Sequence, residues 1–176
     1  MNSEYYKTIC NEMKRLSQNS KVIFLGQQVA SEDFYGTLKG IPLSKRIEMP
    51  VAEEMQMGLS IGFALEGFMP VSIYQRMDFL PRACDQMINH LNLIEEMSRG
   101  LFKPKVIIRT TMGSKKPLDV GPQHSQDLIE LFKVALKFPV LKVTTPKEVH
   151  NAYNYAMKSV SSVMIVELQD LYKEAR

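Results

Sequence analysis

The sequence predicts an α/β fold, a three-layer sandwich in which a mainly parallel sheet is covered by helices on both faces. Short apolar runs alternate along the chain with longer segments whose apolar residues recur at helical spacing. Strands that carry continuous apolar runs are buried on both faces, which is typical of parallel sheets. With 176 residues, 45% of them hydrophobic, the chain can bury a core without metal or disulfide support. We therefore expect residues 1–176 to form a single domain.

The first half of the chain shows this alternation clearly. Helical spacing or a continuous apolar run predicts, in order, a helix around Ile9, Met13 and Leu16, a strand at 22–25 closed by Gly26, an extended piece at 46–49, a helix at 51–65 and a strand at 71–74. The helix at 51–65 contains Gly58 and Gly62, and each glycine costs about 1 kcal/mol of helix propensity. Two glycines four residues apart therefore indicate close packing, and we expect a partner helix there.

The second half continues the pattern around one long loop. The same criteria predict a helix from about 79 to 97, a strand at 105–109, a short helix at 128–132, a strand at 141–143, a helix from 147 to about 160 and a strand at 163–167. Residues 110–126 are polar and rich in glycine and proline, and a loop of that length is itself a hint of function. Ligands of parallel sheets gather at the carboxyl ends of strands, so the candidate loops are 26–31, 49–54, 74–79 and 110–126.

Composition and motifs exclude several classes of protein. The net charge of +3 is spread along the chain, without the basic stripe that nucleic acid requires, and no segment approaches the roughly 20 apolar residues that cross a bilayer. The N-terminus does not resemble a signal peptide, and Cys10 and Cys84 lack framework spacing, so we expect a protein of the cytoplasm. Phosphate-binding, zinc, nucleophile-elbow and dithiol motifs are also missing, which disfavours most self-sufficient enzymes.

A pair of acids, Glu53 and Glu54, stands at the start of the helix at 51–65, behind Pro50. Acidic residues are common at helix N-termini because they complement the helix dipole, so a purely structural role is one interpretation. The other interpretation is a functional role. It depends on the apolar character of this helix, whose first turn could be covered by protein. A glutamate buried there would have a raised pKa and could share a proton with a ring nitrogen of a ligand.

The long loop carries the other candidate, His124, which is either a surface histidine or a catalytic group. His90 and His150 fall within helical segments and are expected to be structural or solvated. Asp85 and Gln86 suit polar positions of a half-exposed helix, whose apolar residues Met87, Leu91 and Ile94 suit the core. Lys115 and Lys116 fit a solvated loop face or contact with a phosphate-bearing partner.

A series of short motifs resembles one family in the order in which they occur. The family is the β subunit of the decarboxylase component of 2-oxoacid dehydrogenase complexes, of the pyruvate and branched-chain types, and the resemblance runs from about Val22 to Tyr172. Its motifs here are Leu25-Gly26-Gln27-Gln28-Val29-Ala30, Gly40-Ile41, Arg46-Ile47, Pro50-Val51-Ala52-Glu53, Gly58, Gly62-Phe63-Ala64-Leu65-Glu66-Gly67, Pro70-Val71, Asp78-Phe79, Ala83-Cys84-Asp85-Gln86 and Gln123-His124-Ser125-Gln126. The last motif distinguishes this family from transketolases and deoxyxylulose-phosphate synthases.

The resemblance implies a role for several residues. The domain would bind the aminopyrimidine ring of thiamine diphosphate, with Glu53 bonded to a ring nitrogen so that the cofactor is activated, and His124 would face the substrate and assist acyl transfer. Gln27, Met77 and Gln86 also fall at cofactor-binding positions. Two of them depart from the family: Gln27 replaces a glutamate and cannot ionise, and Met77 replaces an aromatic ring that stacks on the pyrimidine, where a thioether packs less rigidly.

The resemblance also implies partners. The diphosphate-binding elements and the further C-terminal domain of the family have no counterpart in the chain, and no metal ligand is predicted in it. We expect a homo- or hetero-oligomer in which an α-type subunit holds the diphosphate and Mg²⁺. The oligomer would act on a small 2-oxoacid, and this chain would be inactive alone.

Two rival functions stay open. A noncatalytic interaction or regulatory module that keeps the fold is favoured by Gln27 and Met77 and opposed by Glu53 and His124. A transketolase-like or acyloin-forming subunit would use the same half of the cofactor site.

Overall fold

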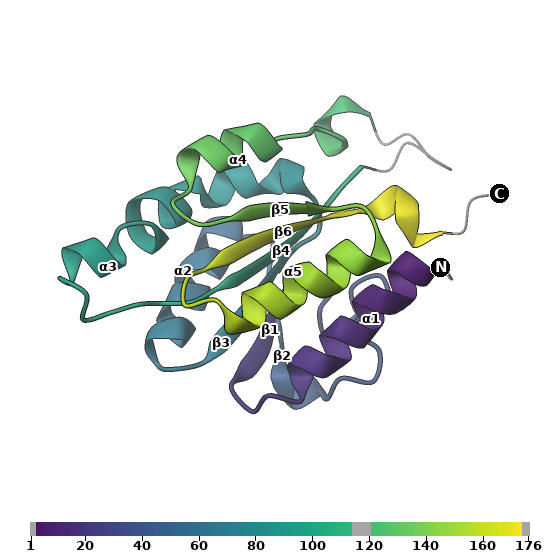
Figure 1. The fold of residues 1–176 in the computed structure, drawn as a ribbon, viewed down its shortest axis with the longest axis horizontal. Helices are drawn as coiled ribbons and strands as arrows, with labels where there is room; N and C mark the ends of the chain where they lie inside the picture. Colours follow the sequence, from purple (N-terminus) through teal and green to yellow (C-terminus); the bar gives the residue numbers. More distant parts are fainter. Residues whose placement is uncertain (1–2, 114–120, 174–176) are drawn as a thin grey trace.

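A computed structural model, which describes residues 3–113 and 121–173, contains a six-stranded parallel sheet of order β2-β1-β3-β4-β6-β5. The strands are β1 (Val22–Gly26), β2 (Arg46–Glu48), β3 (Met69–Tyr74), β4 (Ile107–Met112), β5 (Val140–Val143) and β6 (Val163–Leu168). Figure 1 shows them side by side at the centre of the molecule. The predicted α/β class and the parallel sheet are confirmed.

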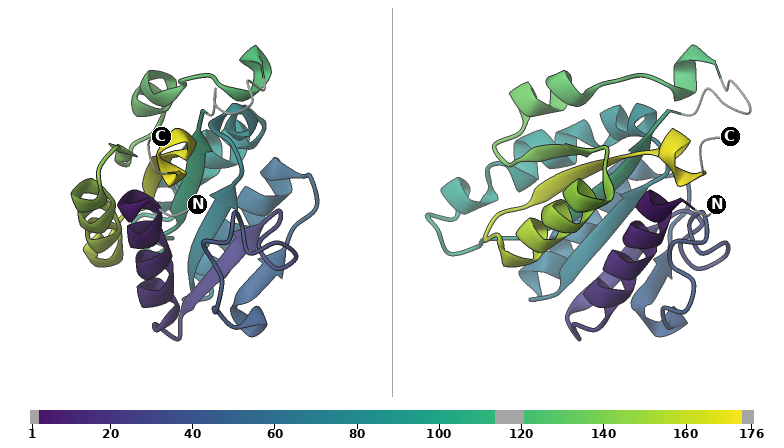
Figure 2. Two further views of the ribbon diagram at one scale, coloured as in Figure 1. Left: turned by 90° about the vertical axis from the view of Figure 1, so that its right-hand side faces the viewer. Right: turned by 45° about the vertical axis from the view of Figure 1, so that its right-hand side comes forward.

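Helices cover both faces of the sheet. In Figure 1, α1 (Glu4–Ser17) and α5 (Pro146–Lys158) lie in front of it and α2 (Glu53–Leu65) lies behind it. The two faces carry separate cores: Ile9 and Val149 pack on the first, and Met57 packs on the second together with α4 (Ile129–Ala135). Figure 2 shows the same three layers from two further sides. The predicted sandwich is therefore confirmed.

Local sequence explains where the front helices begin. Ser3 caps α1, because its hydroxyl accepts a hydrogen bond from the backbone N–H of Tyr6. Thr145 and Glu148 form a capping box at the start of α5, where each side chain bonds the backbone of the other residue. These contacts satisfy N–H groups that an uncapped helix end leaves without partners.

The predicted long helix at 79–97 is helical but is not one regular helix. It consists of a 3₁₀ segment (Met77–Ala83), a π-helical turn (Gln86–Leu91) and α3 (Ile94–Met97). Pro81 has no N–H to donate and disfavours a continuous α-helix through the first piece. Further on, the N–H of Asn92 bonds the carbonyl of Met87, five residues back. Apolar spacing predicted the buried face correctly but could not reveal these breaks.

The fourth strand also differs from its prediction. It was expected at 105–109, with a loop beginning at residue 110, yet β4 runs from Ile107 to Met112. Thr110 and Thr111 are polar but fully buried in the strand, and the Thr111 hydroxyl donates to the carbonyl of Gln75 at 2.5 Å. Lys115 and Lys116 lie outside the described residues.

A buried ion pair joins the last two long strands. Arg109 of β4 and Glu167 of β6 are fully buried and form two N–O contacts of 2.9 Å. The hydroxyls of Tyr153 and Tyr172 donate to the same carboxylate, and Arg109 donates to the hydroxyl of Thr37 at 2.9 Å. Burial raises the pKa of both tyrosines, with a further contribution from Glu167. Through Tyr153 and Tyr172, the pair forms hydrogen bonds that link α5 and the turn after β6 to the sheet.

Candidate functional site

The order of the strands reverses direction between β1 and β3, which makes this the switch point of the sheet. The chain passes from β1 outward to β2 and then crosses back to β3 on the other side of β1. Ligands of open parallel sheets bind at such a switch point, outside the carboxyl ends of the strands. Helix α2 starts there, and Gln56 links its first turn to β1 and β3. The fully buried side-chain amide of Gln56 donates to the carbonyls of Leu25 (3.5 Å) and Ile73 (2.9 Å) and to the hydroxyl of Ser72 (3.1 Å).

The turn after β1 depends on close backbone packing and on one carboxylate. A Cβ placed on Gly26 would lie 2.3 Å from the carbonyl oxygen of Ile73, so only glycine fits there. Beyond it, the Glu48 carboxylate accepts hydrogen bonds from the backbone N–H groups of Gln28 (2.5 Å), Ala30 (2.7 Å) and Ser31 (3.1 Å). Partial burial alone would raise the pKa of Glu48, but these N–H groups together hold it below its usual value.

The two acids at the start of α2 have opposite environments. Glu54 is exposed, whereas Glu53 is only 3% exposed. The Oε2 atom of Glu53 is buried and has no hydrogen-bond partner among the described residues, although the Nε of Arg82 lies 3.3 Å away. Nearby, the Tyr74 hydroxyl bonds the backbone carbonyl of Glu53 at 3.3 Å, and burial, with a contribution from Glu53, raises the pKa of that tyrosine.

Glu53 lies at the wall of an open depression with a volume of about 600 Å³. The polar residues of its lining are Glu53, Glu54, Arg82 and Gln86. The other lining residues are Ala52, Gly58 and the exposed apolar residues Val51, Met55 and Leu59. Burial of Glu53 agrees with the second interpretation of the acid pair, a first turn covered by protein.

The two glycines of α2 differ. A Cβ on Gly58 would lie 3.3 Å from the Gln86 Oε1 atom, so this glycine does allow close packing, within the chain itself. Gly62 is exposed, and a Cβ there would meet nothing within 4 Å. The partner helix predicted at this point therefore stays a prediction.

His124 lies on a separate part of the structure and does not line the depression around Glu53. It ends a 3₁₀ turn (Pro122–His124), is half-buried, and its ring meets that of Phe79 edge to face at 5.7 Å. Its backbone carbonyl accepts a hydrogen bond from Arg76 at 2.9 Å. The other two histidines, expected to be structural or solvated, are both exposed. His90 lies 3.5 Å from Asp85, and His150 lies 2.8 Å from Glu12.

The other predicted cofactor-binding residues are Gln86, Gln27 and Met77, and only the first lines the depression. Gln86 lines the depression, and Gln27 is half-buried in the turn after β1. Met77 is fully buried in the core behind the sheet and does not line the depression, so its contact with a ring stays a prediction. Phe79, two residues further on, is a partly exposed aromatic ring on the same segment.

Sequence reasoning missed three further residues at this edge: Gln56, Arg82 and Arg76. Gln56 is an ordinary helix residue by spacing, and its burial gave no sequence signal. Arg82 belongs to the helical segment whose breaks were not predicted, and Arg76 lies in the turn after β3, so the direction of neither side chain could be inferred. Among the described residues, no group of three or more His, Cys, Asp or Glu side chains could hold a metal ion, and no helix is long and apolar enough to span a membrane.

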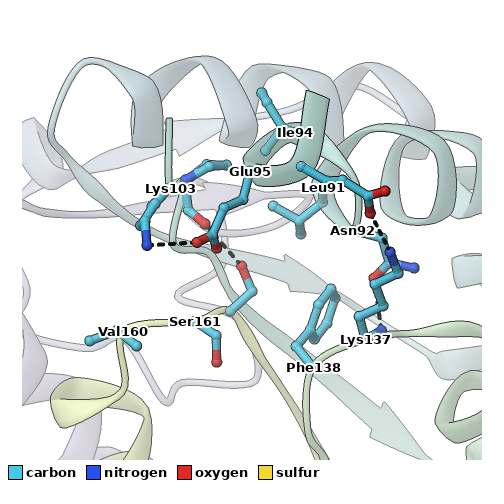
Figure 3. A pocket seen from close by; sticks show the side chains of 12 residues that line it. Leu91, Asn92, Ile94, Glu95, Lys103, Lys137, Phe138, Val160 and Ser161 are labelled. Carbon is cyan, nitrogen blue, oxygen red and sulfur yellow. Dashed lines mark hydrogen bonds and ion pairs between the residues drawn. The ribbon is translucent and has the colours of Figure 1, made fainter. Parts of the chain in front are cut away.

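A second cavity, of about 310 Å³, lies at the other end of the strands (Figure 3). Pro104, Phe138 and Ser162 line it, and they precede β4, β5 and β6 respectively. Its charged side chains are paired with one another, Lys103 with Glu95 at 2.6 Å and Lys137 with Glu96 at 3.1 Å. It contains none of the predicted site residues.

The fold and the depression beside Glu53 define an α/β domain that presents a buried acid near the switch point of a parallel sheet. The chain belongs to the family described as the transketolase pyrimidine-binding domain, which matches residues 6–174. This family is thiamine-diphosphate-dependent.

Named relatives are β subunits of pyruvate dehydrogenase. The chain is 28% identical over 167 residues to the mitochondrial pyruvate dehydrogenase E1 component subunit beta of Ascaris suum, and 28% identical over 170 residues to that of Saccharomyces cerevisiae. These matches cover 90% and 92% of the chain but 45% of each relative. The chain thus spans about half the length of these relatives.

Solved structures support the fold. A split-gene transketolase, described as an inactive beta4 tetramer, superimposes with a TM-score of 0.68 at 18% identity, covering 94% of this chain and 50% of that one. Transketolase from Campylobacter jejuni gives a TM-score of 0.70 at 17% identity, covering 92% and 25%. At such identities the likeness concerns the fold alone.

Proposed function

We propose that this chain is the pyrimidine-binding subunit of a split thiamine-diphosphate-dependent 2-oxoacid decarboxylase or dehydrogenase. The observation that carries the proposal is the Glu53 carboxylate, which is buried at the start of α2, beside an open depression, with one oxygen that lacks a hydrogen-bond partner among the described residues. The exposed Arg82 side chain forms an ion pair with this oxygen at 3.3 Å but no hydrogen bond, and a ring nitrogen that shares a proton with the carboxylate would supply the missing bond.

The residues around Glu53 fit an aminopyrimidine ring. Burial of the carboxyl group keeps water away and favours a shared proton with a weakly basic ring nitrogen. The apolar side chains of Val51, Met55 and Leu59 offer a surface for a flat ring, and Gln86 offers an amide. Thiamine diphosphate, when bound, supplies the nucleophilic carbon of the reaction, and the protein orients it and controls the proton.

The same site needs a partner. The depression is open to solvent, and the face of α2 around it exposes Val51 (78%), Met55 (51%) and Leu59 (39%). Apolar side chains grouped on one exposed helix face mark an interaction surface. We propose that a diphosphate-binding α-type subunit covers this face, contributes the residues for the diphosphate and Mg²⁺, and completes an oligomer.

His124 would act on the substrate side, beyond the ring. Imidazoles are common general acids and bases, and that of His124 lies at the carboxyl edge of the sheet beside the partly exposed ring of Phe79. A 2-oxoacid is the substrate class proposed, in line with the named relatives, which are pyruvate dehydrogenase subunits.

Calorimetric titration of thiamine diphosphate with Mg²⁺ tests the proposal. The chain is titrated alone and then together with the subunit recovered by pull-down from its source. Heat of binding that appears only in the assembly is the expected result. An assembly that forms but binds no cofactor would contradict the proposal and favour the noncatalytic interaction module.

A further inference from the structure

One arginine side chain forms hydrogen bonds with two backbone carbonyl groups, that of His124 and that of the residue after β4. Arg76, in the turn after β3, donates through Nη1 to the carbonyl of Gly113 at 3.2 Å and to that of His124 at 2.9 Å. Gly113 directly follows β4, and His124 ends the turn Pro122–His124. The guanidinium therefore fixes the backbone at His124 relative to the carboxyl end of β4.

Two neighbours of Arg76 contact the same loop. The Asp78 carboxylate accepts a hydrogen bond from the backbone N–H of Gln126 at 3.0 Å. The Phe79 ring meets the His124 ring at 5.7 Å with an interplanar angle of 87°. Segment 76–79 thus contacts the loop through a cation, an anion and an aromatic ring.

The chemistry of arginine suits this position. A guanidinium presents several N–H donors in a fixed plane and stays charged, so it can bond two carbonyl groups at once. Hydrogen bonds from a charged donor are stronger than those between neutral groups. Both bonds come from Nη1, and a lysine ammonium could also donate to two carbonyls, but it lacks the planar geometry that fixes the direction of the guanidinium donors. Because Arg76, Gly113 and His124 are all half-buried, the bonds compete only partly with water.

We propose that Arg76 is a positioning residue for His124: it holds the backbone of the loop so that the imidazole stays against Phe79 at the carboxyl edge of the sheet. A role of this arrangement in acyl transfer rests on the proposed function. The positioning itself is a property of the chain and can be measured without cofactor or partner.

NMR of the imidazole C–H groups in the full chain tests this inference, because there are three histidines, His90, His124 and His150. The Phe79 ring displaces the His124 signals from their random-coil positions, and Phe79→Leu assigns them. In Arg76→Gln, we expect these signals to move toward random-coil positions while those of His90 and His150 stay. Arg76→Lys should restore part of the displacement. Arg99→Gln, which changes an exposed arginine elsewhere, is the matched control and should change none of the three.

Two results would overturn the inference. His124 signals at their wild-type positions in a folded Arg76→Gln chain would show that the arginine does not position the imidazole. Displacement of all three histidines would show a general structural role instead. If Arg76→Gln does not fold, Arg76→Lys is judged by the same criteria. Failure of the proposed function would appear in the cofactor titration and would leave the NMR result unaffected.

Discussion

At the scale of single residues, adjacent acids have different fates. Glu53 is buried against Arg82 and Tyr74, while Glu54 on the next position of the helix is exposed. Successive residues of a helix differ by about 100° in direction, so one can face the sheet while the other faces solvent. Of these two acids, only Glu53 offers a carboxyl group that is protected from water. The exposed Glu54 provides a matched control.

Glu48 gives the first prediction, on the pH dependence of stability. Its pKa in the folded chain lies below the usual glutamate value because three backbone N–H groups bond the carboxylate. The stabilisation is fully present above the unfolded pKa and is lost as pH falls through the folded pKa. Urea unfolding should show Glu48→Gln less stable than wild type at pH 7, with the difference shrinking at acidic pH. The exposed Glu32→Gln should show no such trend, and a difference for Glu48→Gln that is independent of pH would contradict the account.

Much of the site at this scale could be predicted from sequence. The motif Pro50-Val51-Ala52-Glu53 identified the acid, and the structure shows it buried. Burial of Gln56 and the approach of Arg82 could not be predicted, because both depend on contacts between α2 and segments distant in the sequence. Full burial of Met77 could not be predicted from its motif either, and its contact with a ring stays a prediction.

At the scale of elements, α2 has one face toward the sheet and another toward solvent. Its buried residues face the sheet, while its other face carries exposed apolar side chains and Gly62. Apolar residues on all sides of a helix predict burial on all sides. Within residues 3–113 and 121–173, Val51, Met55 and Leu59 on one side of α2 stay exposed, which is compatible with the proposed partner subunit.

Gly62→Ala gives the second prediction. Alanine adds a side chain with no neighbour within 4 Å and raises helix propensity, so the isolated chain should gain about 0.5–1 kcal/mol of unfolding free energy. If a partner helix packs on this face, the same change should weaken assembly. Urea unfolding measures the first effect, and calorimetric titration of the partner subunit measures the second. Unchanged assembly would contradict the proposed place of the partner.

Gly58→Ala is the comparison within the same helix. Its new methyl group would meet the Gln86 side chain at 3.3 Å, so part of the propensity gain should be lost. A larger stabilisation than that of Gly62→Ala would show that the Gln86 contact does not constrain this position.

At the scale of the whole molecule, alternation of apolar runs and helical segments was sufficient to predict the fold class, because a parallel sheet covered on both faces leaves that pattern. The pattern does not specify strand order, so the switch point between β1 and β3 had to come from the structure. Nor did any motif reveal the pair of Arg109 and Glu167, which depends on β4 and β6 being neighbours although 58 residues separate the two partners.

That pair gives the third prediction. Glu167→Gln leaves the fully buried Arg109 without a compensating charge, and loss of one partner of a buried pair costs about 3–5 kcal/mol. The unfolding free energy from urea titration should fall by about this amount. Glu130→Gln, which breaks an exposed pair with Lys133, should cost less than about 1 kcal/mol. Equal effects of the two changes would contradict the structural role assigned to the buried pair.

The most direct test of the central claim is hydrogen exchange at the reactive thiazolium C–H of thiamine diphosphate, followed by NMR in the reconstituted assembly. We expect Glu53→Gln to slow the exchange by about 10²-fold or more, because the proton shared with the pyrimidine ring is lost, while Glu54→Gln exchanges like the wild type. The fold of both variants should persist. Exchange at the wild-type rate in folded Glu53→Gln would contradict the role of Glu53 and, with it, the proposed function.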